Sequence, residues 1–201
     1  MGVGEMRKVI VSEFVTLDGV MEDPVWTVPF NTEEQNQHKF EELQTCDALL
    51  LGRVTYEGFA AAWPKMSETN TVVNQIRDFT IPEGFADRMN SYPKYVASRT
   101  KTPEQMEWNA SLIQGDLKEE VLKLKEQPGR NILVLGSGEL VRTLMQLDLV
   151  DEFRIMVFPV VRGKGKRLFK DDIETMSLKH VYTKTIHSGA VELTYHPAKK
   201  D

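Results

Sequence analysis

Three short polar stretches follow directly after apolar runs of the chain, and each is suited to bind a phosphate. Glycines let a ligand approach the backbone, hydroxyl and guanidinium groups donate hydrogen bonds to phosphate oxygens, and a helix start adds a partial positive charge. This chemistry predicts a cradle for a nucleotide-like anion. The candidate residues are Gly52, Arg53 and Thr55, then Ser98 and Arg99, and finally Gly136, Ser137 and Gly138.

The third stretch, "LVLGSGELVRTLM", is similar to the start of a dinucleotide-binding fold, in which three spaced glycines open a helix. The third glycine of that fingerprint would fall at Val141, and Glu139 would face an incoming pyrophosphate. Both features argue against a Rossmann domain. Two interpretations stay open for the turn alone: an anion-binding turn, or a tight connection that packs a helix onto a strand.

Other polar residues give weaker signals. Arg53 could equally be a solvated residue beside a helix cap. The basic run "RGKGKR" at 162–167 could attract an anionic cofactor or substrate, or form a solvated, mobile loop. The histidines are not spaced as metal ligands, and none lies near the single cysteine, so we expect no metal site. They are His38, His180, His187 and His196.

The whole chain limits the classes of protein to consider. Its 201 residues suit one domain over 1–201 with one core. A net charge of −5 argues against a protein that holds nucleic acid through a general basic field. The apolar runs are too short to span a membrane, and no signal peptide is visible. A single cysteine, Cys46, fits a reducing compartment, so we expect a cytoplasmic protein.

Hydrophobic periodicity predicts an alternation of strands and helices that would position these residues. Strands are expected over 7–15, 48–51, 95–98, 131–136 and 151–161, and a hairpin over 177–197 turns at Ser188-Gly189. Helices are expected over 31–43, 53–62, 116–129 and 139–147, with Asn31 or Thr32 capping the first and Asp116 the third. The region 64–92 is the least clear, and one or two short helices are expected there.

This order predicts an α/β fold in three layers, with a mostly parallel central sheet, an antiparallel edge hairpin and helices on both faces. In such sheets a ligand binds outside the carboxyl ends of the strands. The three candidate turns each follow a strand end. Their convergence on one crevice would therefore be more informative than any one of them.

The combination of motifs resembles the dihydrofolate reductase superfamily, in the branch of the C-terminal reductase domain of bifunctional riboflavin-biosynthesis enzymes. The resemblance covers nearly the whole chain. Its marks are "TLDG", "ALLLGRVTYEGF", and "LGSGELVRTLM" followed by "LVDEFRIMVFPVVRGKGKRLF". The chain lacks the H-x-E and P-C-x-x-C signature of the zinc deaminase module found in those bifunctional enzymes.

The resemblance implies an NADPH-dependent reductase that transfers a hydride to a small heterocycle, pterin-like or ribosylaminopyrimidine-like, and that forms a homodimer. It places Gly52, Arg53 and Thr55 near the adenosine-side phosphates, and Ser98 and Arg99 beside the 2′-phosphate. Gly136, Ser137, Gly138 and Leu140 would lie under the pyrophosphate and the nicotinamide.

Two acidic positions qualify this expectation. Folate reductases carry a carboxylate four residues before a helix phenylalanine, and here Asn36 stands four before Phe40. Because an amide cannot relay a proton as a carboxylic acid does, ordinary folate reduction is not expected. Asp18 is the candidate catalytic acid, although it could equally be a turn residue that bonds its own backbone. The alternative function is an NADP(H)-binding module of the same fold without significant turnover.

Overall fold

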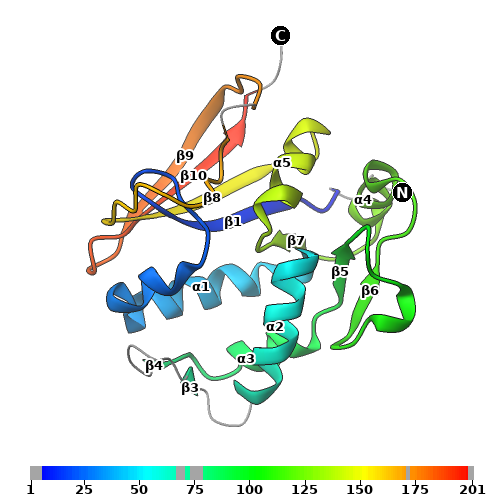
Figure 1. The fold of residues 1–201 in the computed structure, drawn as a ribbon, viewed down its shortest axis with the longest axis horizontal. Helices are drawn as coiled ribbons and strands as arrows, with labels where there is room; N and C mark the ends of the chain where they lie inside the picture. The colour runs from blue at the N-terminus through cyan, green and yellow to red at the C-terminus, as the bar shows by residue number, and fades with distance from the viewer. Residues whose placement is uncertain (1–5, 67–70, 73–78, 171–172, 199–201) are drawn as a thin grey trace.

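The computed structural model describes residues 6–66, 71–72, 79–170 and 173–198, and these build one large mixed sheet (Figure 1). The strand order is β6-β5-β2-β7-β1-β8-β10-β9. The first six strands are mutually parallel, and β10 is antiparallel to both of its neighbours, β8 and β9. The strands are β1 (Val9–Thr16), β2 (Cys46–Gly52), β5 (Lys94–Ala97), β6 (Ala110–Leu112), β7 (Asn131–Val134), β8 (Glu152–Phe158), β9 (Leu178–Thr185) and β10 (Val191–Pro197).

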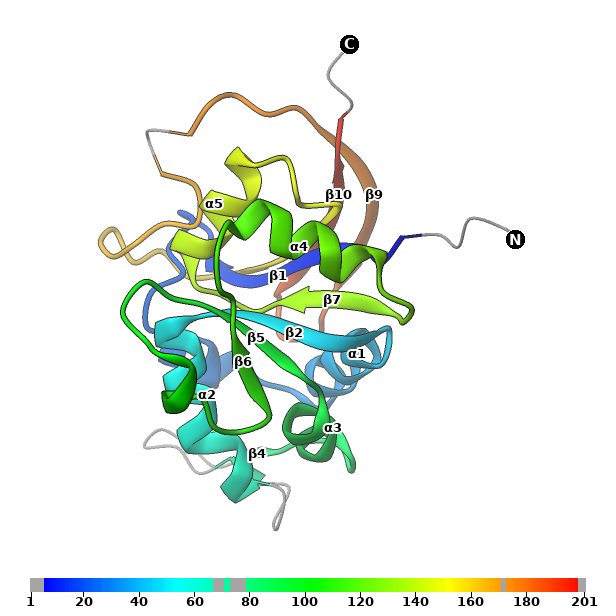
Figure 2. The same ribbon diagram turned by 90° about the vertical axis from the view of Figure 1, so that its right-hand side faces the viewer.

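Helices cover both faces of this sheet (Figure 2). Two helices, α4 (Leu117–Glu126) and α5 (Gly138–Gln146), pack on one face. The other face carries α1 (Glu33–Gln44), α2 (Arg53–Met66) and α3 (Phe85–Ser91). The predicted three-layer α/β fold with an antiparallel edge is therefore confirmed.

Strand β1 lies in the middle of the sheet and is buried on both faces. Val9, Val11 and Val15 point into the core beneath α4 and α5, whereas Ile10 points into the core beneath α1, α2 and α3. Side chains alternate along a strand, so Ser12 belongs to the α1 face and Glu13 to the α5 face. Both polar residues are thus placed inside the protein by the register of β1.

The predicted helix signals agree with the observed helix starts. Thr32 caps α1 by accepting a hydrogen bond from the Gln35 amide, and Asp116 caps α4 by accepting one from the Glu119 amide. The apolar stripe of α5, formed by Leu140, Val141, Leu144 and Met145, is buried as its spacing predicts.

Several elements were not predicted. Short 3₁₀ helices occur at Pro24–Phe30 (η1) and Pro103–Gln105 (η2), and β6 lies outside the expected strands. In the region 64–92, α3 is the one described short helix, and a two-stranded ladder pairs β3 (Thr71–Val72) with β4 (Phe79–Thr80). The rest of the prediction for that region lies partly outside the described residues. Within the described chain, no helix is long and apolar enough to cross a membrane.

Candidate functional site

The three predicted phosphate-binding turns come together at one edge of the sheet. They follow β5, β2 and β7, which are consecutive neighbours, at their carboxyl ends. Gly52 is in register with Ala97, the residue before Ser98. The Gly52 amide also donates a 3.0 Å hydrogen bond to the Gly136 carbonyl oxygen. The convergence expected from the sequence is therefore present in the fold.

A side chain on any of the three glycines of these turns would meet a neighbouring atom. A Cβ atom on Gly52 would lie 2.9 Å from the Ser137 amide nitrogen, and one on Gly136 would lie 2.8 Å from the Thr55 hydroxyl oxygen. Gly136 also has a φ of +88°, and the peptide bond to Ser137 is cis. A Cβ on Gly138 would lie 2.7 Å from the sulfur of Met21. The backbone is thus tightly packed around a half-buried helix start.

Helix α5 begins directly at the glycine turn. Ser137 is its N-cap residue, but the hydroxyl makes no capping hydrogen bond, so it is free to turn toward a ligand. The carboxylate of Glu139 pairs with Lys170 and Arg142, and chiefly the hydrogen bond from Lys170 lowers the Glu139 pKa. Leu140 is buried in the core, so any contact with a cofactor would come from its backbone.

Arg53 lies at the start of α2 and is exposed. Its guanidinium donates a 2.8 Å hydrogen bond to Glu57, and the same carboxylate pairs with Lys101 at 2.9 Å. Two cations therefore converge on one carboxylate at the edge of the three turns. The sequence reasoning missed Lys101, although its place two residues after Arg99 in a basic, polar loop was a usable signal.

The stretch after β5 forms a compact turn. The Ser98 hydroxyl oxygen accepts hydrogen bonds from the amides of Thr100 and Lys101, at 3.2 and 3.1 Å. Arg99 is exposed beside it. This geometry orients the loop backbone, and the predicted roles of Ser98 and Arg99 in binding a cofactor stay predictions.

Asp18 is held in a turn that joins two distant loops. Its carboxylate accepts hydrogen bonds from the Thr16 hydroxyl at 2.6 Å and from the amides of Arg162 and Gly163 at 3.1 and 2.8 Å. These bonds, that of Thr16 first, lower the Asp18 pKa to about 2. An ionised carboxylate donates no proton at neutral pH, so the geometry favours the turn role, and the catalytic role of Asp18 stays a prediction.

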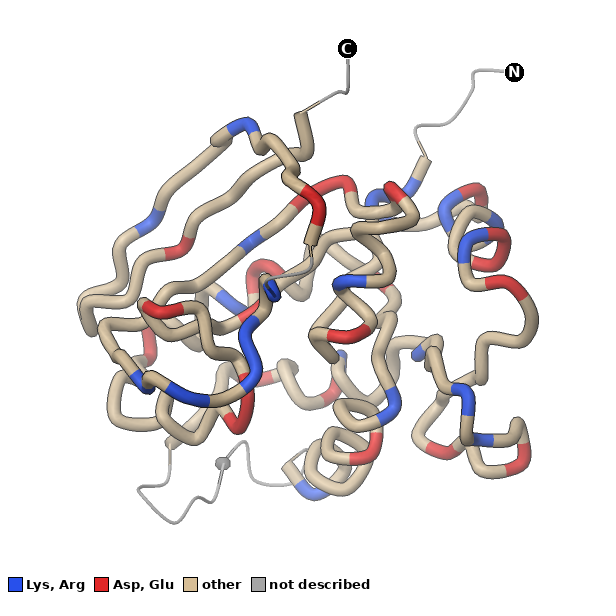
Figure 3. Tube along the Cα trace, turned by 45° about the horizontal axis from the view of Figure 1, so that its top comes forward, with Lys and Arg blue, Asp and Glu red and all other residues tan. Residues whose placement is uncertain are grey.

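The basic run 162–167 is joined to the loop that follows β1. Backbone hydrogen bonds connect Met21 to Lys166 and Leu168 to Gly19, and the Arg162 guanidinium donates to the carbonyl oxygen of Glu22. Blue segments for Lys and Arg mark this run in Figure 3. These hydrogen bonds therefore hold the run against the loop that follows β1.

Asn36 faces other amides rather than an acid. Its side chain exchanges two hydrogen bonds with Asn31, at 2.8 and 3.1 Å, and donates a third to the Thr80 carbonyl oxygen at 2.8 Å. Nearby, Phe158 is fully buried and is surrounded by the rings of Phe14, Trp26 and Phe30. This aromatic cluster lines the carboxyl ends of β1 and β8.

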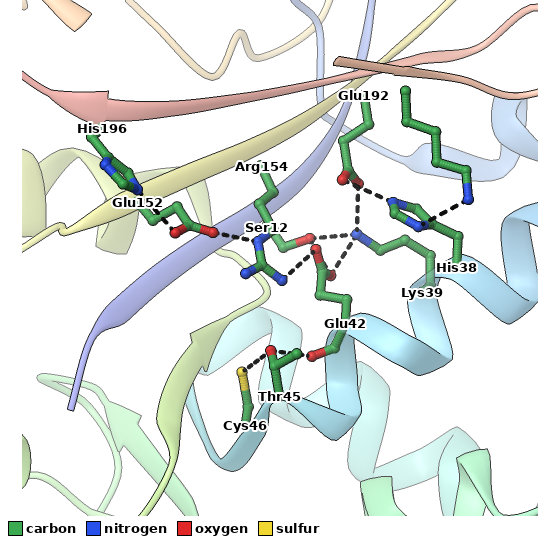
Figure 4. A network of polar contacts seen from close by, with 11 residues as sticks. Ser12, His38, Lys39, Glu42, Thr45, Cys46, Glu152, Arg154, Glu192 and His196 are labelled. Atoms are coloured by element: carbon green, nitrogen blue, oxygen red, sulfur yellow. Dashed lines mark hydrogen bonds and ion pairs between the residues drawn. The ribbon is translucent and has the colours of Figure 1, made fainter. Parts of the chain in front are cut away.

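Buried charge on the α1 face forms a network that the sequence reasoning did not find (Figure 4). The Lys39 ammonium lies 2.6 Å from the Ser12 hydroxyl oxygen, 2.5 Å from a Glu42 oxygen and 3.6 Å from a Glu192 oxygen. His38 bonds the other Glu192 oxygen at 2.8 Å. Arg154 extends the network toward Glu152 and His196. These contacts bind α1 to strands β1, β8 and β10.

Glu13, on the opposite face, is the other buried acid that the sequence reasoning missed. It is 8% exposed, and burial raises its pKa to about 8 despite the opposing charge of Lys39. The signal available was the place of Glu13 in the apolar strand "VIVSEFV". An acid at an inward position of a central strand is unusual. Among the described residues, no group of three or more His, Cys, Asp or Glu side chains is arranged to hold a metal ion.

Comparison with known proteins agrees with this geometry. The family model described as the RibD C-terminal domain matches residues 7–191. The uncharacterized protein YyaP of Bacillus subtilis (strain 168) is 33% identical over 192 residues, which are 96% of each chain. A pyrimidine reductase-like protein from Corynebacterium diphtheriae superposes with a TM-score of 0.64 at 13% identity, covering 96% of this chain and 93% of that one.

A dihydrofolate reductase from Enterococcus faecalis, solved with NADP(H), superposes with a TM-score of 0.56 at 14% identity. The match covers 96% of this chain and 97% of the reductase. At this level of identity the likeness concerns the fold alone.

Proposed function

Because the chain belongs to the RibD C-terminal domain family and has a dihydrofolate-reductase-like fold, we propose that it is an NADPH-dependent reductase. It transfers a hydride to a small heterocyclic substrate of the pterin or ribosylaminopyrimidine kind. The observation that carries the proposal is the meeting of three turns on adjacent strand ends, where Gly52 and Gly136 are closely packed against Ser137 and Thr55. The chain acts as one domain, in the cytoplasm.

The residues present fit a dinucleotide. The amides at the start of α5 have no partners within the helix, and with the helix dipole they favour a pyrophosphate. Thr55 and Ser137 offer hydroxyl groups beside the same turn. Arg53 and Arg99 would hold the phosphates on the adenosine side, because a guanidinium binds phosphate oxygens through two parallel hydrogen bonds.

NADPH supplies the hydride, and the protein supplies orientation and electrostatics. The aromatic cluster around Phe158 would exclude water at the ends of β1 and β8 and would give a planar substrate an apolar surface there. Asn36 supplies no acidic proton at this place, because its amide is bonded to Asn31 and to the Thr80 carbonyl oxygen. The hydride acceptor is thus positioned by packing and hydrogen bonds.

A second function is an NADP(H)-binding module without significant turnover. It is favoured by one specific observation: both positions expected to carry a catalytic acid lack an available proton at neutral pH. Asn36 is an amide, and Asp18 is ionised and occupied by three hydrogen bonds.

We also propose that the protein forms a homodimer through the edge strand β9. Leu178, Val181 and Tyr182 on this strand are 37%, 47% and 53% exposed. Unpaired strand edges with apolar side chains favour pairing with another chain. Light scattering on the protein as it elutes from a size-exclusion column would measure its molecular mass. A monomer mass at micromolar concentration would contradict this assembly.

Two experiments test the cofactor site and a third separates the two functions. Thermal unfolding is followed with NADPH and with NADH, and stabilisation by NADPH is expected; no stabilisation by either would overturn both functions. Arg53→Ala should weaken NADPH binding by about 1.5–3 kcal/mol, because a charge-assisted bond is lost. Oxidation of NADPH, followed by absorbance over a panel of pterins and aminopyrimidines, distinguishes an enzyme from a module.

A further inference from the structure

Glu13 is a buried carboxyl group without an ionic partner. It lies in the middle of β1, facing α5, and its Oε1 atom has no hydrogen-bond partner. Within the described residues no cation lies at ion-pair distance from it. Buried carboxyl groups are normally paired or hydrogen-bonded through both oxygens, because an unpaired buried charge is costly. An orphaned oxygen at this place therefore calls for an explanation.

The carboxyl group lies directly beneath the glycine turn. Its Oε1 atom is 3.7 Å from the point where a Cβ atom of Gly136 would stand, and the Thr55 hydroxyl oxygen is 2.8 Å from the same point. The Gly136 backbone is itself a hydrogen-bond partner of the carboxyl group. The acid, the turn and the first turn of α2 thus meet at one small polar space.

The charges that act on Glu13 come from α1, across the sheet. Lys39 favours its ionised form and Glu42 opposes it, but both are already engaged with each other. From α2 and the glycine turn, the groups that face it are the neutral hydroxyl of Thr55 and the backbone. Burial dominates this balance and favours the neutral acid.

We propose that Glu13 is a positioning residue that must carry a proton when the phosphates of a dinucleotide bind to the turn above it. This inference rests on the proposed function. A neutral acid leaves the partial positive charge at the start of α5 available to the pyrophosphate. An ionised Glu13 would place a negative charge under the same turn, in surroundings where charges are weakly screened. Binding and proton uptake from solvent are therefore coupled.

The test is calorimetric titration of the protein with NADPH at pH 7 and pH 9, each in two buffers of different ionisation enthalpy. With a Glu13 pKa of about 8, the protonated fraction falls about tenfold across this range. We expect wild-type affinity to fall about tenfold and nearly one proton to be taken up on binding at pH 9. This window lies above the second phosphate pKa of about 6, so the ligand contributes little.

Glu13→Gln keeps the size of the side chain and cannot ionise. It should bind NADPH equally at both pH values and take up no proton. Lys94→Met is the matched control. Burial lowers the pKa of Lys94 to about 8, so it titrates in the same range. It is the first residue of β5, at the other end of that strand from the turn. That variant should keep the wild-type pH dependence. Glu13→Ala, which also lacks the titrating group, serves if the glutamine variant does not fold.

The outcomes separate this inference from the proposed function. Wild-type binding without pH dependence or proton uptake overturns the role of Glu13 and leaves the cofactor site intact. The same holds if Glu13→Gln retains the wild-type dependence. Failure of the wild-type protein to bind NADPH at either pH overturns the cofactor site itself, and the coupling with it.

Discussion

Two acids on the same sheet, Glu13 and Glu192, are almost equally buried yet have opposite electrostatic surroundings. On the α1 face, burial alone would raise the Glu192 pKa, but the hydrogen bond from His38 and the charge of Lys39 bring it to about 2. On the α5 face, burial raises the Glu13 pKa to about 8 because the opposing charge of Lys39 is too weak. One acid is therefore ionised and the other protonated at neutral pH.

This contrast between Glu13 and Glu192 distinguishes buried acids that stabilise the fold from buried acids that face a ligand site. In the α1 network, cations inside the protein compensate the carboxylates (Figure 4). The network therefore joins α1 to the sheet without a bound ligand. Glu13 is left uncompensated beneath the cradle of glycines. Perturbed acids of this second kind occur preferentially at functional sites.

The largest expected effect is on the pH dependence of stability. A folded-state pKa of about 8 against 4.5 corresponds to about 5 kcal/mol. Because the folded state keeps the proton longer, wild-type stability falls as pH rises from about 4.5 to 8. Glu13→Gln should lack this fall, as measured by denaturant unfolding across that range.

Glu192→Gln is the counterpart that sharpens the contrast. Its ionised form is favoured in the folded state, so the stability it contributes is present above pH 4.5 and is lost as pH falls toward 2. Parallel pH profiles for the two variants would contradict the distinction between the two faces.

Lys39→Met should be the next largest change. It removes the cation shared by Glu42 and Glu192 and leaves two buried carboxylates poorly compensated, at a cost of about 3–5 kcal/mol. Urea unfolding at pH 7 measures it. Lys123→Met, which removes an exposed i,i+3 pair on α4, is the control and should change little; equal effects would show that the network is not special.

Gly136→Ala tests the geometry of the cradle. The residue has a φ of +88°, and a Cβ atom would press on Thr55, so a destabilisation of about 1–3 kcal/mol is expected together with weaker NADPH binding. In contrast, Gly58→Ala in the interior of α2 meets no atom within 4 Å and should stabilise by about 0.5–1 kcal/mol. A harmless Gly136→Ala would mean that the turn is not tightly constrained.

The smallest expected effect concerns the exposed pair at the edge of the cradle. Glu57→Gln frees Arg53 and Lys101, so we expect almost no change in unfolding temperature. NADPH affinity should rise a few-fold at low salt, and the gain should shrink as salt is raised. Unchanged affinity at low salt would place the two cations away from the phosphates.

The fold was predictable because local signals agreed with it. Apolar runs ending in Gly52 and Gly136, caps at Thr32 and Asp116, and the hairpin at Ser188-Gly189 all specify elements through near neighbours in the sequence. The order of strands in the large sheet depends on pairings between distant segments. No pattern in a single stretch encodes those pairings.

The site was predictable to the extent that it is made of backbone. Glycine turns can be recognised by residue type, whereas the pairings of Lys101 with Glu57 and of Asp18 with the amides of Arg162 and Gly163 join segments that are distant in the sequence. Glu13 was missed for a related reason. Its chemistry comes from burial and from the lack of an ionic partner, and the residue type alone predicts neither.

The central place of β1 has a consequence for synthesis of the chain. Its flanking strands, β7 and β8, come late in the sequence, and the contact between Lys8 and Asn131 spans 123 residues. A ribosome that adds roughly 5–20 residues per second leaves β1 without a neighbour for about 6–25 s. During that time the apolar strand must be shielded in some other way, so a nascent chain stalled before β7 is a natural client for a chaperone.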